Sequence, residues 1–133
     1  MFSSDSHVVE PADLWAKRIT PQFKERAPYL AHEADGDQWY VEGLMFGSTG
    51  VGGQAGVRFE DASQLHWKGT YEEDIPLGGW DPNAHVKDLD VDHIVADVLY
   101  PTQGLSVWIL PDGELLSAIF RAYNDWLSDF CKP

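Results

Sequence analysis

The fold of this 133-residue chain is decided by its first strand, Phe2-Ser3-Ser4-Asp5-Ser6-His7-Val8-Val9-Glu10-Pro11. Its apolar ends predict a strand over residues 2–9, which the Glu-Pro pair terminates. Residues two apart on a strand point to the same face, so the Asp5 carboxylate and the His7 imidazole converge on one point. Zinc and manganese both accept these groups as ligands. The spacing alone leaves a second interpretation open, namely a helix-capping aspartate beside a hydrogen-bonded core histidine.

Three helical segments and a second strand continue the pattern. Helical turns are expected over residues 11–19 and 21–28. Asp81-Pro82 predicts a helix to about residue 91, with Val86 and Leu89 facing inward. The apolar run of residues 94–100 then predicts a strand that is buried on both faces of a parallel sheet.

The last helix has the clearest periodicity in the chain. Pro111-Asp112-Gly113 begins it, and its apolar residues repeat every 3.6 positions from Leu115 to Phe130. This stripe is expected to be a core face, and if it were exposed in a fragment it would be an aggregation or dimerisation surface. The order strand, helix, strand, helix predicts an α/β protein with a parallel sheet or barrel.

An insertion separates the two βα units. Residues 29–33 and 38–42 flank Ala34-Asp35-Gly36-Asp37, which predicts a β-hairpin. The glycine-rich tract 43–56 is expected to be a loop, and residues 57–77 an irregular excursion.

Composition excludes several classes of partner. Acidic residues outnumber basic ones 22 to 9, for a net charge of −13, which argues against a nucleic-acid or anionic-membrane partner. The single cysteine, Cys131, excludes an internal disulfide and fits a reducing cytoplasm. No signal peptide or membrane-spanning segment is visible, so we expect a cytoplasmic protein.

Several other polar residues are expected to be structural. Asp97 lies inside an apolar run and needs a partner there, since a buried carboxylate must be paired or hydrogen-bonded. His32, His66, His85 and His93 lack a partner at ligand spacing and are expected at the surface. His93 follows a predicted helix at a position where glycine is usual.

Six blocks in order resemble a known family: residues 5–11 with Asp13-Leu14-Trp15, Arg26-Ala27-Pro28, residues 78–82, residues 87–90, residues 98–102 and residues 121–126. They are similar to the N-terminal third of the amidohydrolase-related family often called amidohydrolase 2. That family includes metal-dependent hydrolases and decarboxylases of the aminocarboxymuconate-semialdehyde and γ-resorcylate type.

The resemblance implies the N-terminal part of a distorted (β/α)8 TIM barrel. Residues 1–28 would form the first βα unit, residues 29–77 a hairpin and loop insertion, and residues 78–133 a helix, the second strand and its following helix. A closed barrel needs roughly 250 residues. We therefore expect either the first part of a longer enzyme or a truncated product that is inactive alone.

The resemblance also implies a site and an activity. Asp5 and His7 would bind a divalent metal, Zn²⁺ first and Mn²⁺ second, with the remaining ligands and the catalytic residue on later strands. Glu10 and Thr102 are candidates for substrate contact, although capping of the following helix is the more ordinary role for Glu10. The intact enzyme would be a homo-oligomer that hydrolyses or non-oxidatively decarboxylates a small carboxylated or cyclic molecule. The alternative is a non-catalytic, acidic α/β interaction domain.

Overall fold

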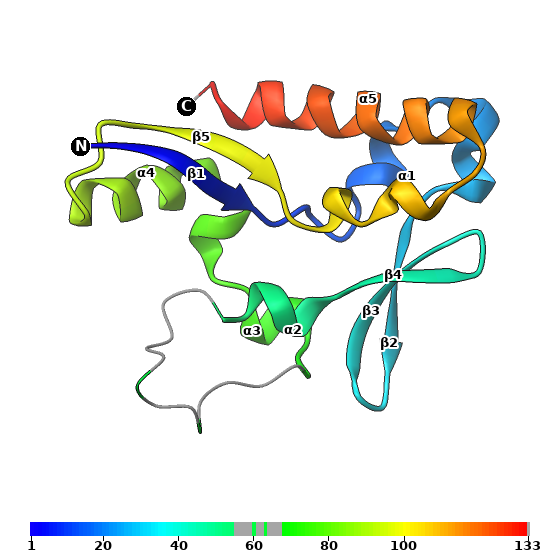
Figure 1. Cartoon of the computed structure of the whole chain (residues 1–133), viewed down its shortest axis with the longest axis horizontal. Coiled ribbons are helices and arrows are strands. Elements are labelled where there is room, and N and C mark those ends of the chain that lie inside the picture. Colours follow the sequence, from blue (N-terminus) through cyan, green and yellow to red (C-terminus); the bar gives the residue numbers. More distant parts are fainter. Residues whose placement is uncertain (55–59, 61–62, 64–67, 133) are drawn as a thin grey trace.

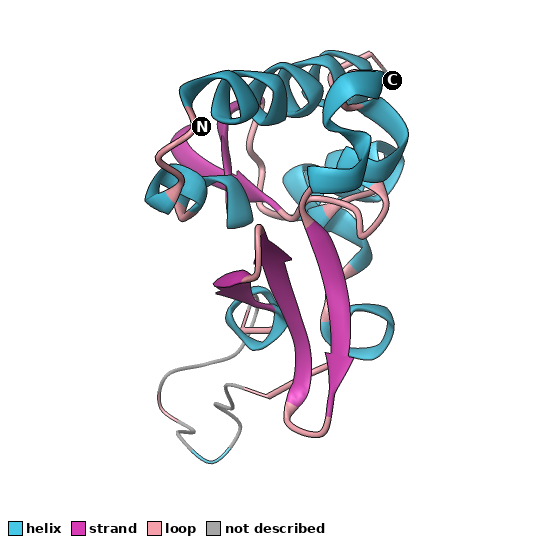
Figure 2. Ribbon diagram, turned by 90° about the vertical axis from the view of Figure 1, so that its right-hand side faces the viewer, coloured by secondary structure: helices cyan, strands magenta, loops and turns pink. Residues whose placement is uncertain are grey.

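The structure is a computed structural model, and it describes residues 1–54, 60, 63 and 68–132. Part of the excursion expected over residues 57–77, including His66, lies outside these residues. Within them the chain combines a parallel two-stranded sheet with an antiparallel three-stranded sheet. The fold is therefore mixed α/β (Figure 2).

The parallel sheet contains both predicted strands, β1 (Phe2–Val8) and β5 (Ala96–Pro101). Pairing begins with Phe2 opposite Ala96 and ends with Val8 opposite Pro101. The register shifts between Ser3 and Ser6, so the strict alternation of faces along β1 is interrupted there. In Figure 1 the chain's N-terminus lies at one end of this pair, and α5 (Gly113–Phe130) runs alongside it.

One face of this strand pair is exposed in the part of the chain that the structure describes. The side chains alternate along β5: Val98 and Tyr100 are 51% and 42% exposed, whereas Asp97 and Leu99 are half-buried. The prediction of a strand buried on both faces is therefore wrong for these residues. Burial on both faces requires cover on both sides of a sheet, and β5 has only β1 beside it among the described strands.

The predicted helix after Asp81 is confirmed as α4 (Pro82–Val91). Asp81 caps it by accepting a hydrogen bond from the Ala84 N–H at 2.8 Å. The expectation that Val86 faces inward is wrong, because Val86 is 43% exposed, whereas Leu89 is half-buried and lines a cavity. The helix packs against the short η3 (Leu77–Gly79) instead of burying an apolar stripe.

The helix α4 ends with the conformation that glycine usually supplies. His93 has a φ of +56°, in the left-handed region. Its N–H donates to the Asp90 carbonyl at 3.2 Å, and the Ile94 N–H donates to the Leu89 carbonyl at 2.9 Å. This pair of bonds is the Schellman motif, which satisfies carbonyls left free at a helix end. His93 is exposed, as expected, and so is His32.

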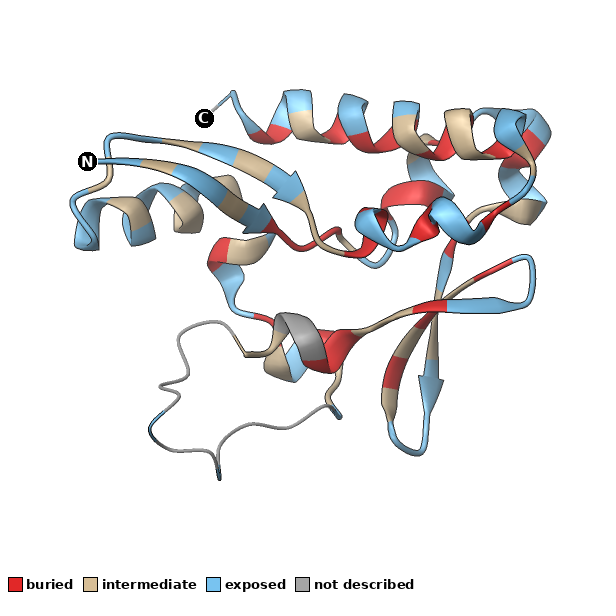
Figure 3. Ribbon diagram, in the orientation of Figure 1, coloured by how far each residue is buried: buried red, intermediate tan, exposed pale blue. Residues whose placement is uncertain are grey.

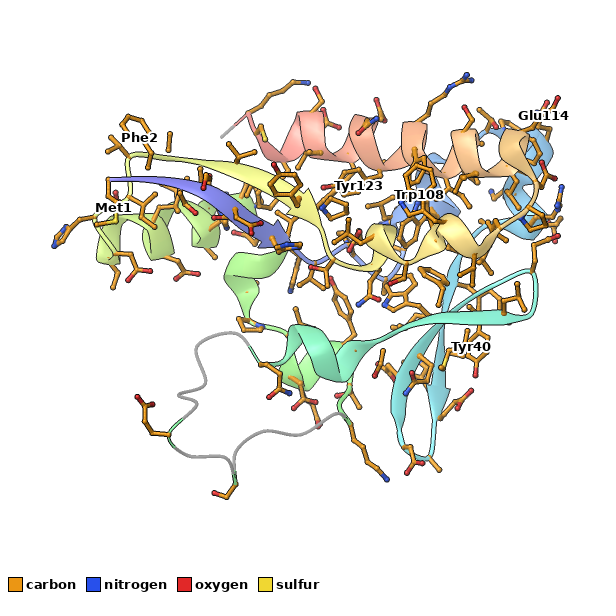
Figure 4. The ribbon with its side chains drawn as sticks, in the orientation of Figure 1. Met1, Phe2, Tyr40, Trp108, Glu114 and Tyr123 are labelled. Atoms are coloured by element: carbon orange, nitrogen blue, oxygen red, sulfur yellow. The ribbon has the colours of Figure 1, made fainter. Side chains whose placement is uncertain are left out.

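The last predicted helix is confirmed as α5, which Asp112 caps through the N–H groups of Glu114 and Leu115. Its apolar side faces the rest of the molecule and is buried (Figure 3), and Tyr123 lies on that side (Figure 4). Much of this side packs on α1 (Leu14–Arg18). The prediction that this stripe is a core face is therefore confirmed, and the exposure expected for an isolated fragment is not seen. Neither α5 nor any other helix in the described part of the chain is long and apolar enough to cross a membrane.

The insertion forms an antiparallel sheet of β2 (Tyr29–Glu33), β3 (Gly36–Val41) and β4 (Leu44–Ser48). The predicted hairpin is confirmed, but β4 occupies part of the tract expected to be a loop. Glu42 and Gly43 form the turn between β3 and β4, with φ values of +52° and +76°. Two positive φ values in a two-residue hairpin loop are typical of a type I′ turn, which glutamate rarely enters.

The insertion belongs to the same core as the parallel sheet. Trp15 of α1 is fully buried and meets Trp39 of β3 edge to face, with ring centres 5.2 Å apart. Phe46 of β4 lies 6.3 Å from both indoles. The remaining short elements are η1 (Pro21–Arg26), α2 (Thr49–Gly52), α3 (Tyr71–Asp74), η4 (Gln103–Leu105) and η5 (Val107–Ile109).

Candidate functional site

Asp5 and His7 lie together in the carboxyl-terminal half of β1. The Oδ1 atom of Asp5 is 3.6 Å from Nε2 of His7, and their side chains are 77% and 43% exposed. Both therefore point into solvent from the open side of the strand. A cation between them could contact a carboxylate oxygen and an imidazole nitrogen together.

The ring of His7 is held in one orientation by the neighbouring strand. Its Nδ1 atom lies 2.9 Å from the carbonyl oxygen of Pro101, the last residue of β5. A carbonyl only accepts hydrogen bonds, so we assign the proton of the neutral ring to Nδ1. Nε2 then keeps its lone pair on the side of Asp5. Metal-binding histidines generally donate their other ring N–H to a carbonyl or carboxylate in this way.

The residues present thus fit part of a metal site. Among the described residues no group of three or more His, Cys, Asp or Glu side chains could hold a metal ion. Asp5 and His7 supply a matched oxygen and nitrogen donor, but a firm zinc site needs at least three protein ligands. A complete zinc site would therefore need ligands beyond Asp5 and His7.

Thr102 lies directly after β5 and beside the same strand end. Its Oγ1 donates to the Val8 carbonyl at 2.7 Å, so the hydroxyl is already engaged with β1. Thr102 and His7 both line a cavity of about 710 Å³. Gly79 of η3 and His85 of α4 line other parts of it. A small molecule in this cavity would contact the strand ends.

Glu10 is placed differently from either sequence expectation. Its side chain is fully buried, and its two carboxylate oxygens accept from the N–H groups of Gln103 and Gly104 at 2.9 and 2.8 Å. It does not cap α1, whose N-cap residue is Asp13. Burial raises the pKa of Glu10, and the hydrogen bonds from the Gln103 and Gly104 N–H groups partly oppose that shift.

The structural role expected for Asp97 is confirmed, and its partner is His85. Nε2 of His85 lies 3.0 Å from Oδ2 of Asp97, and Nδ1 lies 2.9 Å from the Gly78 carbonyl. The surface position expected for His85 is wrong, because its side chain is only 14% exposed. The need of Asp97 for a buried partner was the available signal, but the sequence did not indicate which histidine would meet it.

Tyr100 also lies beside the candidate ligands. It stands opposite His7 in the ladder, and the two ring centres are 6.0 Å apart. The parallel register thus places Tyr100 opposite His7, with Asp5 beside His7 and Thr102 one residue past the ladder.

Comparison with known proteins finds a similar fold in a solved structure. No protein-family model and no curated protein matches the chain. Its structure is similar to the crystal structure of an amidohydrolase from Mycobacterium avium subsp. paratuberculosis, with a TM-score of 0.69 at 19% sequence identity. The match covers 96% of this chain and 37% of the other. The chain thus spans just over a third of the length of the structure it matches, and at this identity the likeness concerns the fold.

Proposed function

We propose that this chain is the N-terminal part of a metal-dependent amidohydrolase-type enzyme with a TIM-barrel fold. Within that barrel, β1 and β5 would be the first two strands, and the three-stranded sheet an insertion between them. The support is the parallel strand pair with its intervening helix and the fold similarity to part of an amidohydrolase. Active sites of such barrels lie at the carboxyl ends of the strands. His7 and Thr102 lie at those ends, and Asp5 lies at the middle of β1 beside His7.

The observation that carries the proposal is the orientation of His7. Its Nδ1 is fixed by the Pro101 carbonyl, and its Nε2 lies 3.6 Å from the Asp5 carboxylate. In the metal-free chain this arrangement already directs a nitrogen lone pair and a carboxylate oxygen to a place where one cation could contact both. We therefore assign Asp5 and His7 as ligands for Zn²⁺ or, as a second choice, Mn²⁺.

The proposed reaction is hydrolysis, or non-oxidative decarboxylation, of a small carboxylated or cyclic substrate. A bound divalent metal supplies polarisation of a carbonyl or carboxylate, or a more acidic water. The described residues would bind the metal and position the substrate beside it. Of the two candidates for substrate contact, Thr102 is the better placed, because it lines the cavity whereas both oxygens of Glu10 are occupied by backbone N–H groups.

A zinc titration of the chain followed by nitrogen NMR tests this proposal. We expect Zn²⁺ to shift the His7 Nε2 resonance, with an affinity below that of a complete site because ligands are missing. Asp5→Ala should weaken the response and His7→Ala should abolish binding. The matched control is His32→Ala, since His32 is also an exposed histidine beside an aspartate, with Nδ1 2.7 Å from Asp37 Oδ1. Zinc binding that survives His7→Ala would exclude the assigned site.

A non-catalytic, acidic interaction domain is the second candidate. It is favoured by the net charge of −13 and by the small number of ligand side chains that the described residues bring together. The same titration separates the two, because such a domain should give no zinc response at His7. Sedimentation of the full chain with and without Zn²⁺ would then report on its self-association.

A further inference from the structure

Glu10 is the buried carboxylate that the proposed chemistry leaves unused, and it lies close to the candidate ligand pair in the chain. The β1–β5 ladder ends with Val8 opposite Pro101. Beyond that point β1 turns away, since the Val9 N–H donates to the Gly79 carbonyl at 2.7 Å. The residues that follow Pro101 are joined to the end of β1 and to Glu10 by hydrogen bonds that involve side chains.

Successive hydrogen bonds hold the two strand ends together. The His7 ring donates to the Pro101 carbonyl, and the next residue of β5's end, Thr102, donates to the Val8 carbonyl. Glu10 then accepts from Gln103 and Gly104. These bonds follow one another along both segments of the chain. The Pro101 carbonyl, which accepts from the His7 ring, therefore lies next to a loop that Glu10 anchors.

The carboxylate is suited to this anchoring because it is enclosed. Its side chain has no exposed surface, and a charged acceptor makes stronger hydrogen bonds with backbone N–H groups than a neutral one does. Gly104 allows the close approach, because an added Cβ would lie 3.0 Å from Pro101 Cβ and 3.2 Å from Glu10 Oε1. A shift of this loop would therefore also move Pro101.

We propose that Glu10 is a positioning residue, which fixes the Pro101 carbonyl and thereby holds the His7 ring with Nε2 free for a metal. The inference rests on the proposed function only in taking His7 as a ligand. The positioning itself is a property of the metal-free chain.

The test is Glu10→Gln in the metal-free chain, read by amide hydrogen exchange and by the nitrogen resonances of the His7 ring. Glutamine has one acceptor oxygen, so the N–H of Gln103 or Gly104 would face an NH₂ group. We expect exchange of these amides to accelerate about ten- to a hundredfold. We also expect the His7 ring to change from the Nδ1–H form to a mixture of tautomers.

Asp37→Asn is the matched control. Asp37 is 2% exposed, and its Oδ2 accepts from the Tyr71 N–H at 2.8 Å, so the variant weakens a similar buried bond in the insertion. It should leave the His7 tautomer unchanged. Should Glu10→Gln not fold, Gly104→Ala pushes on the same carboxylate without removing it and should give a smaller change of the same kind.

Two results would overturn the inference. One is faster amide exchange with an unchanged His7 tautomer, which would make Glu10 a structural residue only. The other is an equal tautomer change in Asp37→Asn, which would indicate a general loss of stability. Failure of the proposed function would give a different result. Zinc would then bind independently of His7, while amide exchange and the His7 tautomer in the metal-free chain would still respond to Glu10→Gln as expected.

Discussion

The imidazole of His85 joins α4 to β5, with its Nε2 3.0 Å from Oδ2 of Asp97. The same ring reaches the Gly78 carbonyl through Nδ1 at 2.9 Å. A single side chain thus links the helix, the strand and η3. With 14% and 9% of their side chains exposed, His85 and Asp97 are shielded enough for this contact to contribute to stability.

Removal of either partner should destabilise the chain. Asp97→Ala leaves the His85 Nε2 without its acceptor, and we expect the free energy of unfolding to fall by about 1–3 kcal/mol. In a double-mutant cycle with His85→Ala, the coupling should be about 0.5–3 kcal/mol. Urea denaturation provides the measurement. The exposed pair Lys17–Asp13 is the control and should couple by less than about 1 kcal/mol.

The two buried tryptophans should respond differently to replacement by phenylalanine. Trp15 Nε1 donates to the Ile119 carbonyl at 3.2 Å, whereas Trp39 Nε1 is buried with no hydrogen-bond partner among the described residues. Trp15→Phe should lower the free energy of unfolding by about 1–3 kcal/mol. Trp39→Phe loses similar volume but also removes an unpaired N–H, so it should be less destabilising by about 1 kcal/mol. Equal losses in thermal or urea unfolding would contradict this.

Gly36 should not tolerate a side chain. Its φ is +109°, and an added Cβ would lie 2.6 Å from the backbone N and O of Gly69. Gly36→Ala therefore combines backbone strain with a clash, and we expect a loss of about 1–3 kcal/mol. Gly113→Ala is the control, because an added Cβ there meets nothing within 4 Å and the residue opens α5. It should be neutral or stabilising by up to about 1 kcal/mol.

Acid should destabilise the chain in part through Asp112. The Leu115 N–H and then the Arg26 guanidinium hold the pKa of this carboxyl below its ordinary value of 3.8. A carboxyl with a lowered folded-state pKa contributes stability that is present above its ordinary pKa and lost as pH falls through the folded-state value. Asp112→Asn should therefore flatten the decline of stability below about pH 4.

The contribution of Glu10 to the pH dependence of stability should have the opposite sign to that of Asp112, so Glu10 provides the comparison. Burial raises its pKa above the ordinary value of 4.5, so its protonation favours the folded state as pH falls from the folded-state pKa toward 4.5. Glu10→Gln should remove that gain. Urea midpoints of Asp112→Asn and Glu10→Gln, measured between pH 7 and pH 3, test both expectations. If both variants changed the pH dependence of the midpoint in the same direction, the opposite signs assigned to the two carboxyl groups would be contradicted.

Most regular elements could be predicted because their signals are local. Asp81 and Asp112 marked the starts of α4 and α5, and the Asp-Gly pair marked the first hairpin. The strand β4 was missed because its turn uses Glu42, a residue that rarely has a positive φ. Arg26 holds that glutamate through bonds of 2.9 and 2.8 Å, a contact across 16 positions that no local pattern contains.

The sequence by itself determined the alternation of strand and helix, the helix caps and the pairing of Asp5 with His7, because each depends on residues within about one turn or strand. Only the tertiary structure decided that Pro101 orients His7, that Glu10 holds Gln103 and that one face of β5 is open. These features join residues more than 90 positions apart or depend on what covers a sheet. Their energies come from burial and geometry that exist only after the chain has folded.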